Sequence, residues 1–198
     1  MPRLILSNHP RIAVRIRLGV LLLATGIVLA ASAALRTASG LAGRPGCNGA
    51  RGLPGHVGIG HMRQATLCLI NHIRARHGLG PLHSVVSLRK AAQHHSGDMV
   101  RRNYFSHDTP GGGTIQSRIG GSGYLAGAHR YLYGEIIGGG TASLGSPKAV
   151  MRAWMHSGTH RSEILNRAFH DLGVGVARGF PGRGHSGATF TVDFGSRH

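Results

Sequence analysis

The spacing of apolar residues changes along this chain from a helical period to a strand period, and this change most constrains the fold. Apolar residues recur at helical spacing over residues 62–77, 87–99 and 148–156. Residues 172–177 and 188–194 have the composition of two strands near the end of the chain. Helices that come first, a glycine-rich middle and strands that come late predict an α+β domain, with helices packed on a mostly antiparallel sheet.

The N-terminal residues predict an export signal ahead of that domain. Arginines precede an apolar run over residues 18–35, and Ala-Ser-Ala at residues 31–33 has the small-x-small pattern of a cleavage site. We expect residues 1–34 to be a signal peptide. The alternative is an uncleaved N-terminal anchor, because the apolar run approaches the length that spans a bilayer. Both interpretations predict a secreted or extracytoplasmic domain.

Residues 35–60 predict a Gly/Pro/Arg-rich linker, followed by a single domain over residues 61–198. Glycine recurs at every third position from Gly40 to Gly58, which is a collagen-like period. The run is short and poor in proline, so we expect a flexible spacer and a monomer. An assembly or adhesive module built on this repeat is the alternative.

Charge and cysteine content indicate which classes of partner the chain can bind and whether its cysteines form a disulfide. The chain has 23 Lys and Arg against 6 Asp and Glu, a formal net charge of +17. This charge favours polyanions such as an anionic wall polymer or lipid, although coding bias explains it equally well. No run of basic and aromatic residues indicates a specific nucleic-acid module. In an exported chain, Cys47 and Cys68 predict a disulfide rather than two unrelated thiols.

Histidine is the residue type most able to carry chemistry here, with 15 in the chain. His107 follows a helical segment, and His160 opens another. The positive end of a helix dipole disfavours a cationic histidine at the helix N-terminus. Such a histidine stays neutral, which is the form that metal binding or base catalysis requires. Glu135 lies among apolar and glycine residues and needs a partner if buried. We therefore predict a shared site of His107, Glu135 and His160. His95 lies on an apolar helical stripe, so we expect a hydrogen-bonded core histidine.

These segments resemble, in order, the bacterial branch of the CAP superfamily (cysteine-rich secretory protein, antigen 5, pathogenesis-related-one) over roughly residues 63–195. The matching blocks are Asn103-Tyr104-Phe105-Ser106-His107-x-Thr109-Pro110 with Arg118-Ile119, then Gly134-Glu135, then Trp154-Met155-x-Ser157-Gly158-x-His160-Arg161, and finally Asp171-Leu172-Gly173-Val174-Gly175 and Asp193-Phe194-Gly195. The resemblance implies a three-layer α-β-α sandwich. It also implies a cleft where two histidines and acidic residues bind a divalent cation, zinc or calcium, and His107, Glu135 and His160 fall on those positions.

The chain departs from the family pattern at two places near this cleft. Ile136 replaces the usual asparagine after the glutamate, which removes an amide that could orient the site. Gly111 stands where bacterial members often carry aspartate. A metal site needs about four ligands, or three plus water, and Asp108 and Asp193 are the replacement candidates.

The sequence thus predicts a secreted CAP-domain protein that binds an extracellular ligand through a His/Glu cleft. Family resemblance implies a cell-wall polymer, a lipid or a protein as that ligand. The alternative is a metal-assisted extracellular hydrolase with His107, Glu135 and His160 as catalytic candidates, because zinc would lower the pKa of a bound water. The usual enzyme signatures are missing from the sequence, so the sequence leaves catalysis open.

Overall fold

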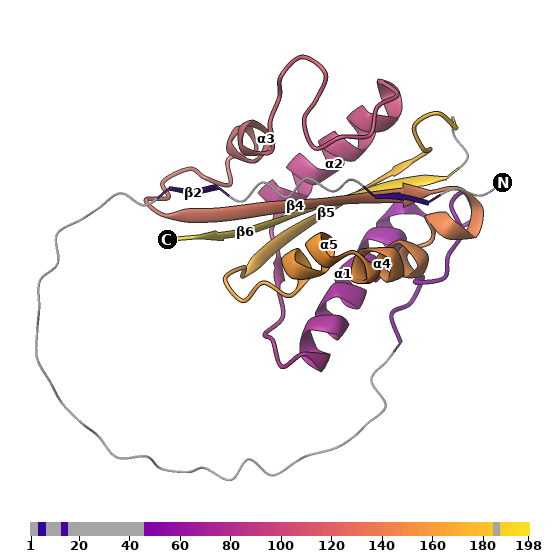
Figure 1. Ribbon diagram of the computed structural model, residues 1–198, viewed down its shortest axis with the longest axis horizontal. Helices are drawn as coiled ribbons and strands as arrows, with labels where there is room; N and C mark the ends of the chain where they lie inside the picture. The colour runs from indigo at the N-terminus through magenta and orange to yellow at the C-terminus, as the bar shows by residue number, and fades with distance from the viewer. Residues whose placement is uncertain (1–3, 7–12, 16–45, 184–186) are drawn as a thin grey trace, which may run out of the picture.

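The computed structural model of the protein describes residues 4–6, 13–15, 46–183 and 187–198 (Figure 1). Its elements, in chain order, are β1 (Leu4–Leu6), β2 (Ala13–Arg15), α1 (Ile59–Arg76), β3 (His83–Ser84), α2 (Val86–Arg101), α3 (Ile115–Gly121), β4 (Tyr131–Gly140), a 3-10 helix (Ala142–Gly145), α4 (Pro147–His156), α5 (Gly158–Ile164), β5 (Asp171–Arg178) and β6 (Ala188–Arg197). The predicted apolar run over 18–35 and its cleavage site lie outside these residues. Strands β1 and β2 fall within the predicted signal peptide (residues 1–34) and nevertheless pair with β4. No helix within the described ranges is long and apolar enough to cross a membrane.

A mixed sheet of six strands forms the centre of the protein. Its order is β1-β4-β6-β5-β3, and β2 also pairs with β4. Strands β4 and β6 are antiparallel from the pair Tyr131↔Arg197 to the pair Gly140↔Ala188. Among the described strands only β3 and β5 pair in parallel. The prediction of a mostly antiparallel sheet is therefore confirmed.

Helices cover both faces of this sheet, as the family resemblance implies. Figure 1 shows α2 and α3 on one side of the strands and α1, α4 and α5 on the other. Alternation along β6 explains the two faces. Phe190, Val192 and Phe194 belong to the main apolar cluster, whereas Thr191, between them, accepts a hydrogen bond from Ser96 of α2 at 2.9 Å. The protein is a three-layer α-β-α sandwich.

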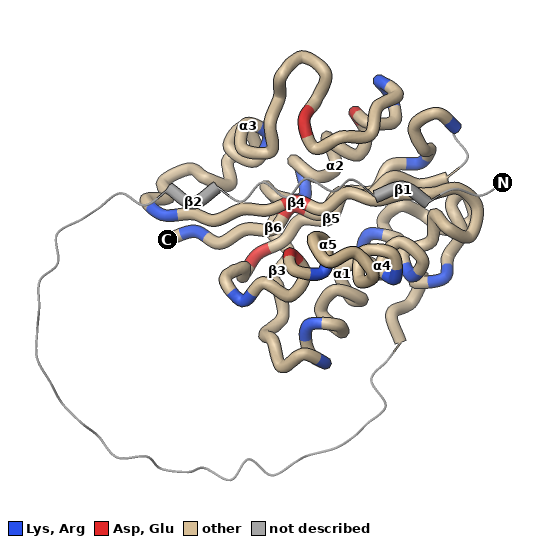
Figure 2. The backbone as a smooth tube through the Cα atoms, viewed as in Figure 1, with Lys and Arg blue, Asp and Glu red and all other residues tan. Residues whose placement is uncertain are grey.

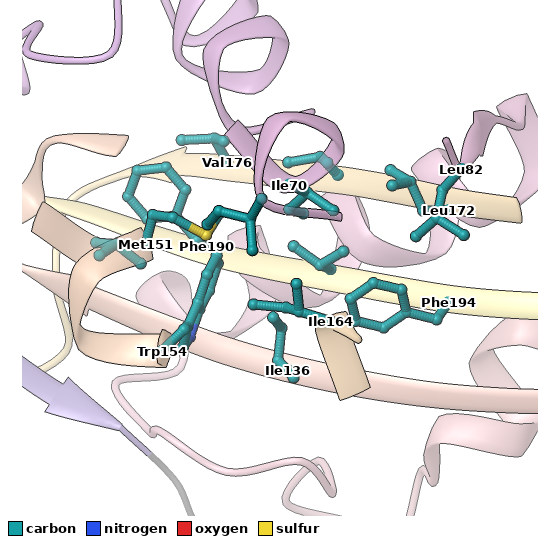
Figure 3. Packing of buried hydrophobic residues seen from close by; sticks show 14 of the residues in the cluster. Ile70, Leu82, Ile136, Met151, Trp154, Ile164, Leu172, Val176, Phe190 and Phe194 are labelled. Atoms are coloured by element: carbon teal, nitrogen blue, oxygen red, sulfur yellow. The ribbon is translucent and has the colours of Figure 1, made fainter. Parts of the chain in front are cut away.

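The apolar layer beneath α1, α4 and α5 is the main core. Ile70 of α1, Trp154 of α4 and Ile164 of α5 meet Phe190 in this layer, and all four are fully buried (Figure 3). The Trp154 ring packs edge-on against Phe190, and its indole N–H donates to the carbonyl of Ile137 at 3.0 Å. Burial of each large apolar side chain contributes about 1.5–3 kcal/mol, so this layer holds the sheet rigid.

Helix α2 packs unusually close to the opposite face of the sheet. A Cβ atom at Gly173 would meet the backbone of Leu88, and one at Gly175 would meet the backbone of Ala92. Glycine at these two positions of β5 lets the helix approach the strands directly. The close approach brings the α2 side chains that point inward, including His95, to the middle of the sheet.

The segment over residues 46–57 belongs to the domain rather than to a free linker. Cys47 and Cys68 form a disulfide, which confirms that prediction. The Lys148 N–H at the start of α4 donates to the carbonyl of Ala50 at 2.7 Å. These bonds fix the second half of the predicted 35–60 linker against α1 and α4, so the domain begins before residue 61. Residues 35–45 lie outside the described part of the chain.

Candidate functional site

Glu135 lies at the centre of β4, and its carboxylate is completely buried. Its Oε1 accepts a hydrogen bond from His107 Nδ1 at 2.7 Å, and its Oε2 accepts one from Arg118 Nη2 at 2.6 Å. Burial alone would raise the pKa of Glu135, but the hydrogen bond from His107 and the positive charge of Arg118 lower it to about 2. Glu135 is therefore ionised at neutral pH.

His107 reaches Glu135 from the loop that follows α2. The side chain is 6% exposed. An ionised carboxylate only accepts hydrogen bonds, so His107 carries a proton on Nδ1. A carboxylate that holds Nδ1 in this way fixes the tautomer and the orientation of a histidine ring. The structure thus joins two of the three predicted site residues directly.

Arg118 comes from α3, whose first turn is fixed by a reciprocal capping box between Thr114 and Ser117. Its side chain is only 8% exposed and forms an ion pair with Glu135. Its Nε and Nη1 atoms are buried and have no hydrogen-bond partner among the described residues. The guanidinium therefore neutralises Glu135 and still has donors to offer.

Two further titratable groups lie beside Glu135, and burial favours the neutral form of each. His95 Nε2 donates to the carbonyl of Ser106 at 2.9 Å and lies 3.8 Å from Glu135 Oε1. Burial lowers the pKa of His95 to about 4, so it is the hydrogen-bonded core histidine that its helical position predicts. Asp193 is the partner of Glu135 across the β4–β6 pair. Burial, followed by the charge of Glu135, raises the pKa of Asp193 well above its usual range.

His160 and Glu163 approach β4 from its opposite face on α5. His160 Nδ1 hydrogen-bonds to Ser157 Oγ at 2.7 Å, and Glu163 follows one helical turn later. Glu163 Oε2 is buried without a hydrogen-bond partner in the described structure. A Cβ at Gly134 would meet this carboxylate, so the glycine makes room for it. Burial raises the pKa of Glu163 to about 7, and interaction with His107 partly offsets that rise.

The predicted metal site is only partly assembled by these contacts. His107 and Glu135 touch, and His160 lies on α5 beside Glu163. Within the described ranges no group of three or more His, Cys, Asp or Glu side chains is placed to hold a metal ion. Because both oxygens of Glu135 accept hydrogen bonds, its evident role is to orient His107. The three-ligand metal centre stays a prediction.

The two departures from the family pattern have local explanations. Ile136 is buried in the apolar cluster on the face opposite Glu135, so its side chain does not replace any contact of that carboxylate. Gly111 has a φ of +105° in an exposed turn, a conformation that an aspartate would adopt only with strain. The replacement candidate Asp108 lies in the same loop, where its N–H donates to Ser106 Oγ at 3.3 Å.

Arg118 and Glu163 are the site residues that sequence reasoning missed. Arg118 lies in the stretch that matches the family pattern most specifically, and this position was the one indication in the sequence that it belongs to the site. Glu163 falls on an unspecified position of its block, three residues after His160, and only its spacing on a short helix could have indicated it.

Comparison with known proteins agrees with this fold. The model of the Cysteine-rich secretory protein family (CAP) matches residues 67–194, and the chain belongs to that family. The uncharacterized protein YkwD of Bacillus subtilis (strain 168) is 35% identical over 126 residues, which cover 64% of this chain and 44% of YkwD. The uncharacterized membrane protein YlbC of the same organism is 32% identical over 114 residues, 57% of this chain and 30% of YlbC. The chain thus spans less than half the length of either relative.

Solved structures show the same fold. An extracellular protein containing an SCP domain from Bacillus anthracis str. Ames matches with a TM-score of 0.55 and 32% identity, over 70% of this chain and 43% of that one. An outer surface protein from Borrelia burgdorferi matches with a TM-score of 0.60 over 72% of this chain and 97% of that one. Its 19% identity makes this a likeness of fold alone. The protein is therefore a CAP domain of the bacterial type.

Proposed function

We propose that this CAP-domain protein acts outside the cytoplasm as a binding protein that holds its ligand at the site around His107 and Glu135. The observation that carries the proposal is unused hydrogen-bonding capacity around β4. Two donor atoms of Arg118 on the Glu135 face, and one oxygen of Glu163 on the α5 face, are buried without partners in the described structure. Buried polar groups in folded proteins nearly always have partners. A polar ligand or ordered water would satisfy these groups.

The charge balance of the site favours an uncharged polar ligand. Arg118 neutralises the ionised Glu135, His95 has a pKa of about 4 and is neutral at pH 7, and the raised pKa of Asp193 favours its neutral form. Sugar or peptide units of a cell-wall polymer have this chemistry, and we favour them over a lipid or a protein. The extracytoplasmic location is supported by the predicted signal segment and by the similar proteins, which are described as extracellular and outer-surface proteins.

Co-sedimentation with purified bacterial peptidoglycan, stripped of its anionic polymers, tests this proposal. We expect the full chain to sediment and the His107→Ala and Glu163→Gln variants to bind about tenfold more weakly, since each loses roughly one hydrogen bond to a buried group. His72→Ala, at an exposed position of α1, is the matched control. Equal losses in all three variants, or no sedimentation of the wild type, would overturn the proposal.

A metal-assisted hydrolase is the second candidate, and the near-neutral pKa of Glu163 is the observation that favours it. His107 suits a metal ligand because its Nδ1 is held by a carboxylate, and His107 with His160 would hold the ion. A divalent cation such as zinc, when bound, lowers the pKa of a coordinated water to about 7. Glu135, with a pKa of about 2, is a weak base, whereas Glu163, with a pKa of about 7, can take up a proton at neutral pH.

Calorimetric titration with zinc and then calcium separates this candidate from simple ligand binding. One-to-one binding that is lost in both His107→Ala and His160→Ala, and kept in His72→Ala, would support a metal centre and justify a substrate screen. Turnover that survives His107→Ala would rule the hydrolase out, as would the absence of metal binding by the wild type.

A further inference from the structure

Three cationic side chains surround a hollow between the disulfide-tied segment and α4, and none of the residues of the His107 site lines it. Arg51, Lys148 and Arg152 line this hollow of about 300 Å³. A second hollow of about 460 Å³ adjoins it and shares Arg51 and Lys148. All three cations are exposed, and no acidic residue among the described ones lines either hollow. We call the two hollows together the Arg51–Lys148–Arg152 groove.

The fold holds these charges together across a long sequence separation. The Cys47–Cys68 disulfide ties the Arg51 segment to α1, and the hydrogen bond from Lys148 N–H to the Ala50 carbonyl docks it on α4. Lys148 and Arg152 are four residues apart on α4, so they share one face of that helix. Like charges at this spacing repel each other, which favours a counter-ion between them.

The protein itself supplies no counter-ion in the part of the chain that the structure describes. The arginines paired with carboxylates there are those at positions 101, 102 and 118. The N-terminus of α4 contributes little to anion binding because its amides are engaged: Pro147 has no N–H, and Ala149 N–H donates to Ser146 Oγ. The positive character of the groove therefore comes from its side chains. Figure 2 shows the other Lys and Arg residues spread widely over the chain.

We propose that the Arg51–Lys148–Arg152 groove binds a soluble polymer with repeating phosphate groups. Guanidinium groups pair well with phosphate oxygens, and two adjoining hollows that share two cations suit successive units of one chain. Two adjoining shallow hollows can follow a polymer strand, whereas a bilayer presents a plane. The apolar side chains of Leu53, Leu69 and Leu144 in the walls leave contact area for the uncharged parts of such a polymer.

Titration of the full chain with long-chain inorganic polyphosphate tests this site against the overall charge of the protein. The groove variant Arg51→Gln/Lys148→Gln/Arg152→Gln loses three charges. The control variant Arg76→Gln/Lys90→Gln/Arg178→Gln loses three charges from exposed positions outside the groove. We expect about a tenfold loss of affinity or more in the groove variant and less than about threefold in the control. Added salt should weaken wild-type binding.

Several outcomes would contradict the proposal that this groove binds a phosphate polymer. Equal losses in both triple variants would mean that only net charge matters, and a wild type that does not bind polyphosphate at low salt would remove the proposal outright. Groove-dependent binding to phosphatidylglycerol vesicles without binding to polyphosphate would make the ligand a membrane instead. His107→Ala should bind polyphosphate normally, so failure of this site and failure of the proposed function are separable. Circular dichroism checks that each variant is folded.

Discussion

A buried glutamate lies at each face of β4, and the two carboxyl groups differ widely in pKa. On the face toward α2 and α3, the Glu135 carboxylate has a pKa of about 2. On the face toward α5, the Glu163 carboxyl has a pKa of about 7. Both residues are almost completely buried, and the two groups approach neighbouring residues of one strand, since Glu163 lies against Gly134.

Partners, rather than burial, decide this difference. Burial disfavours both carboxylates, but Glu135 receives hydrogen bonds from His107 and from the Arg118 guanidinium, while one oxygen of Glu163 has no partner in the described residues. One face therefore holds a fixed charge, and the other holds a group that can exchange a proton near neutral pH. Glu135 therefore serves to orient His107, and Glu163 is the carboxyl group of the two that can respond to pH.

Removal of the Arg118 charge should cause the largest change in the free energy of unfolding. Arg118→Met leaves the buried Glu135 without its guanidinium partner, and we expect the free energy of unfolding at pH 7 to fall by about 3–5 kcal/mol, as for other broken buried ion pairs. Urea denaturation measures the change. The double variant Arg118→Met/Glu135→Gln removes the stranded charge and should recover part of the loss. A loss below about 1 kcal/mol in the single variant would mean that His107 alone stabilises the carboxylate.

This ion pair also marks the limit of what the sequence could predict about the site. His107 and Glu135 were predicted together because they match family positions, and the structure joins them at 2.7 Å. The role of Arg118 depends on how α3 folds back over β4, a contact between residues 17 positions apart that no local pattern encodes. Glu163 was missed because its environment is created by a glycine on another element, Gly134.

The fold was predicted better where apolar periodicity is strong. The helices α1, α2 and α4 and the strands β5 and β6 carry regular apolar spacing and were anticipated within a few residues. Strand β4 was not, because four of the ten residues of Tyr131–Gly140 are glycines, which dilute its pattern. At least one of those glycines has a packing role, since a Cβ at Gly138 would meet the Trp154 ring. The glycine at this position of β4 is therefore required by tertiary packing, which the local sequence pattern does not reveal.

A neutral substitution of Glu163 should change how the stability of the protein depends on pH. The folded-state pKa of about 7 lies above the ordinary value of 4.5. The folded protein therefore holds the proton more tightly than the unfolded chain does, and Glu163 reduces stability as the pH rises from about 4.5 through about 7. Glu163→Gln removes this penalty, so we expect the variant to be more stable than the wild type by about 1–3 kcal/mol above pH 7.

Urea denaturation of both proteins between about pH 4 and pH 8 measures that difference. The stability difference should be small near pH 4 and should grow with rising pH. Asp171→Asn is the matched control. Asp171 is a carboxylate of the same domain that contacts neither Glu135 nor Glu163, and it accepts a hydrogen bond from Tyr124. A pH-independent difference for Glu163→Gln would show that Glu163 ionises normally in the folded protein.

The smallest effect should come from Asp193, which faces Glu135 across the strand pair. Burial, followed by the charge of Glu135, raises the pKa of Asp193 well above its usual range. This shift favours the protonated carboxyl, whose shape and charge asparagine matches. We expect Asp193→Asn to change the free energy of unfolding at pH 7 by less than about 1 kcal/mol. Glu135→Gln on the opposite strand should cost about 2–4 kcal/mol, because it leaves the Arg118 charge largely buried and unpaired. A large loss in Asp193→Asn would place the negative charge on Asp193 instead and reverse the roles of the two carboxyl groups on this face.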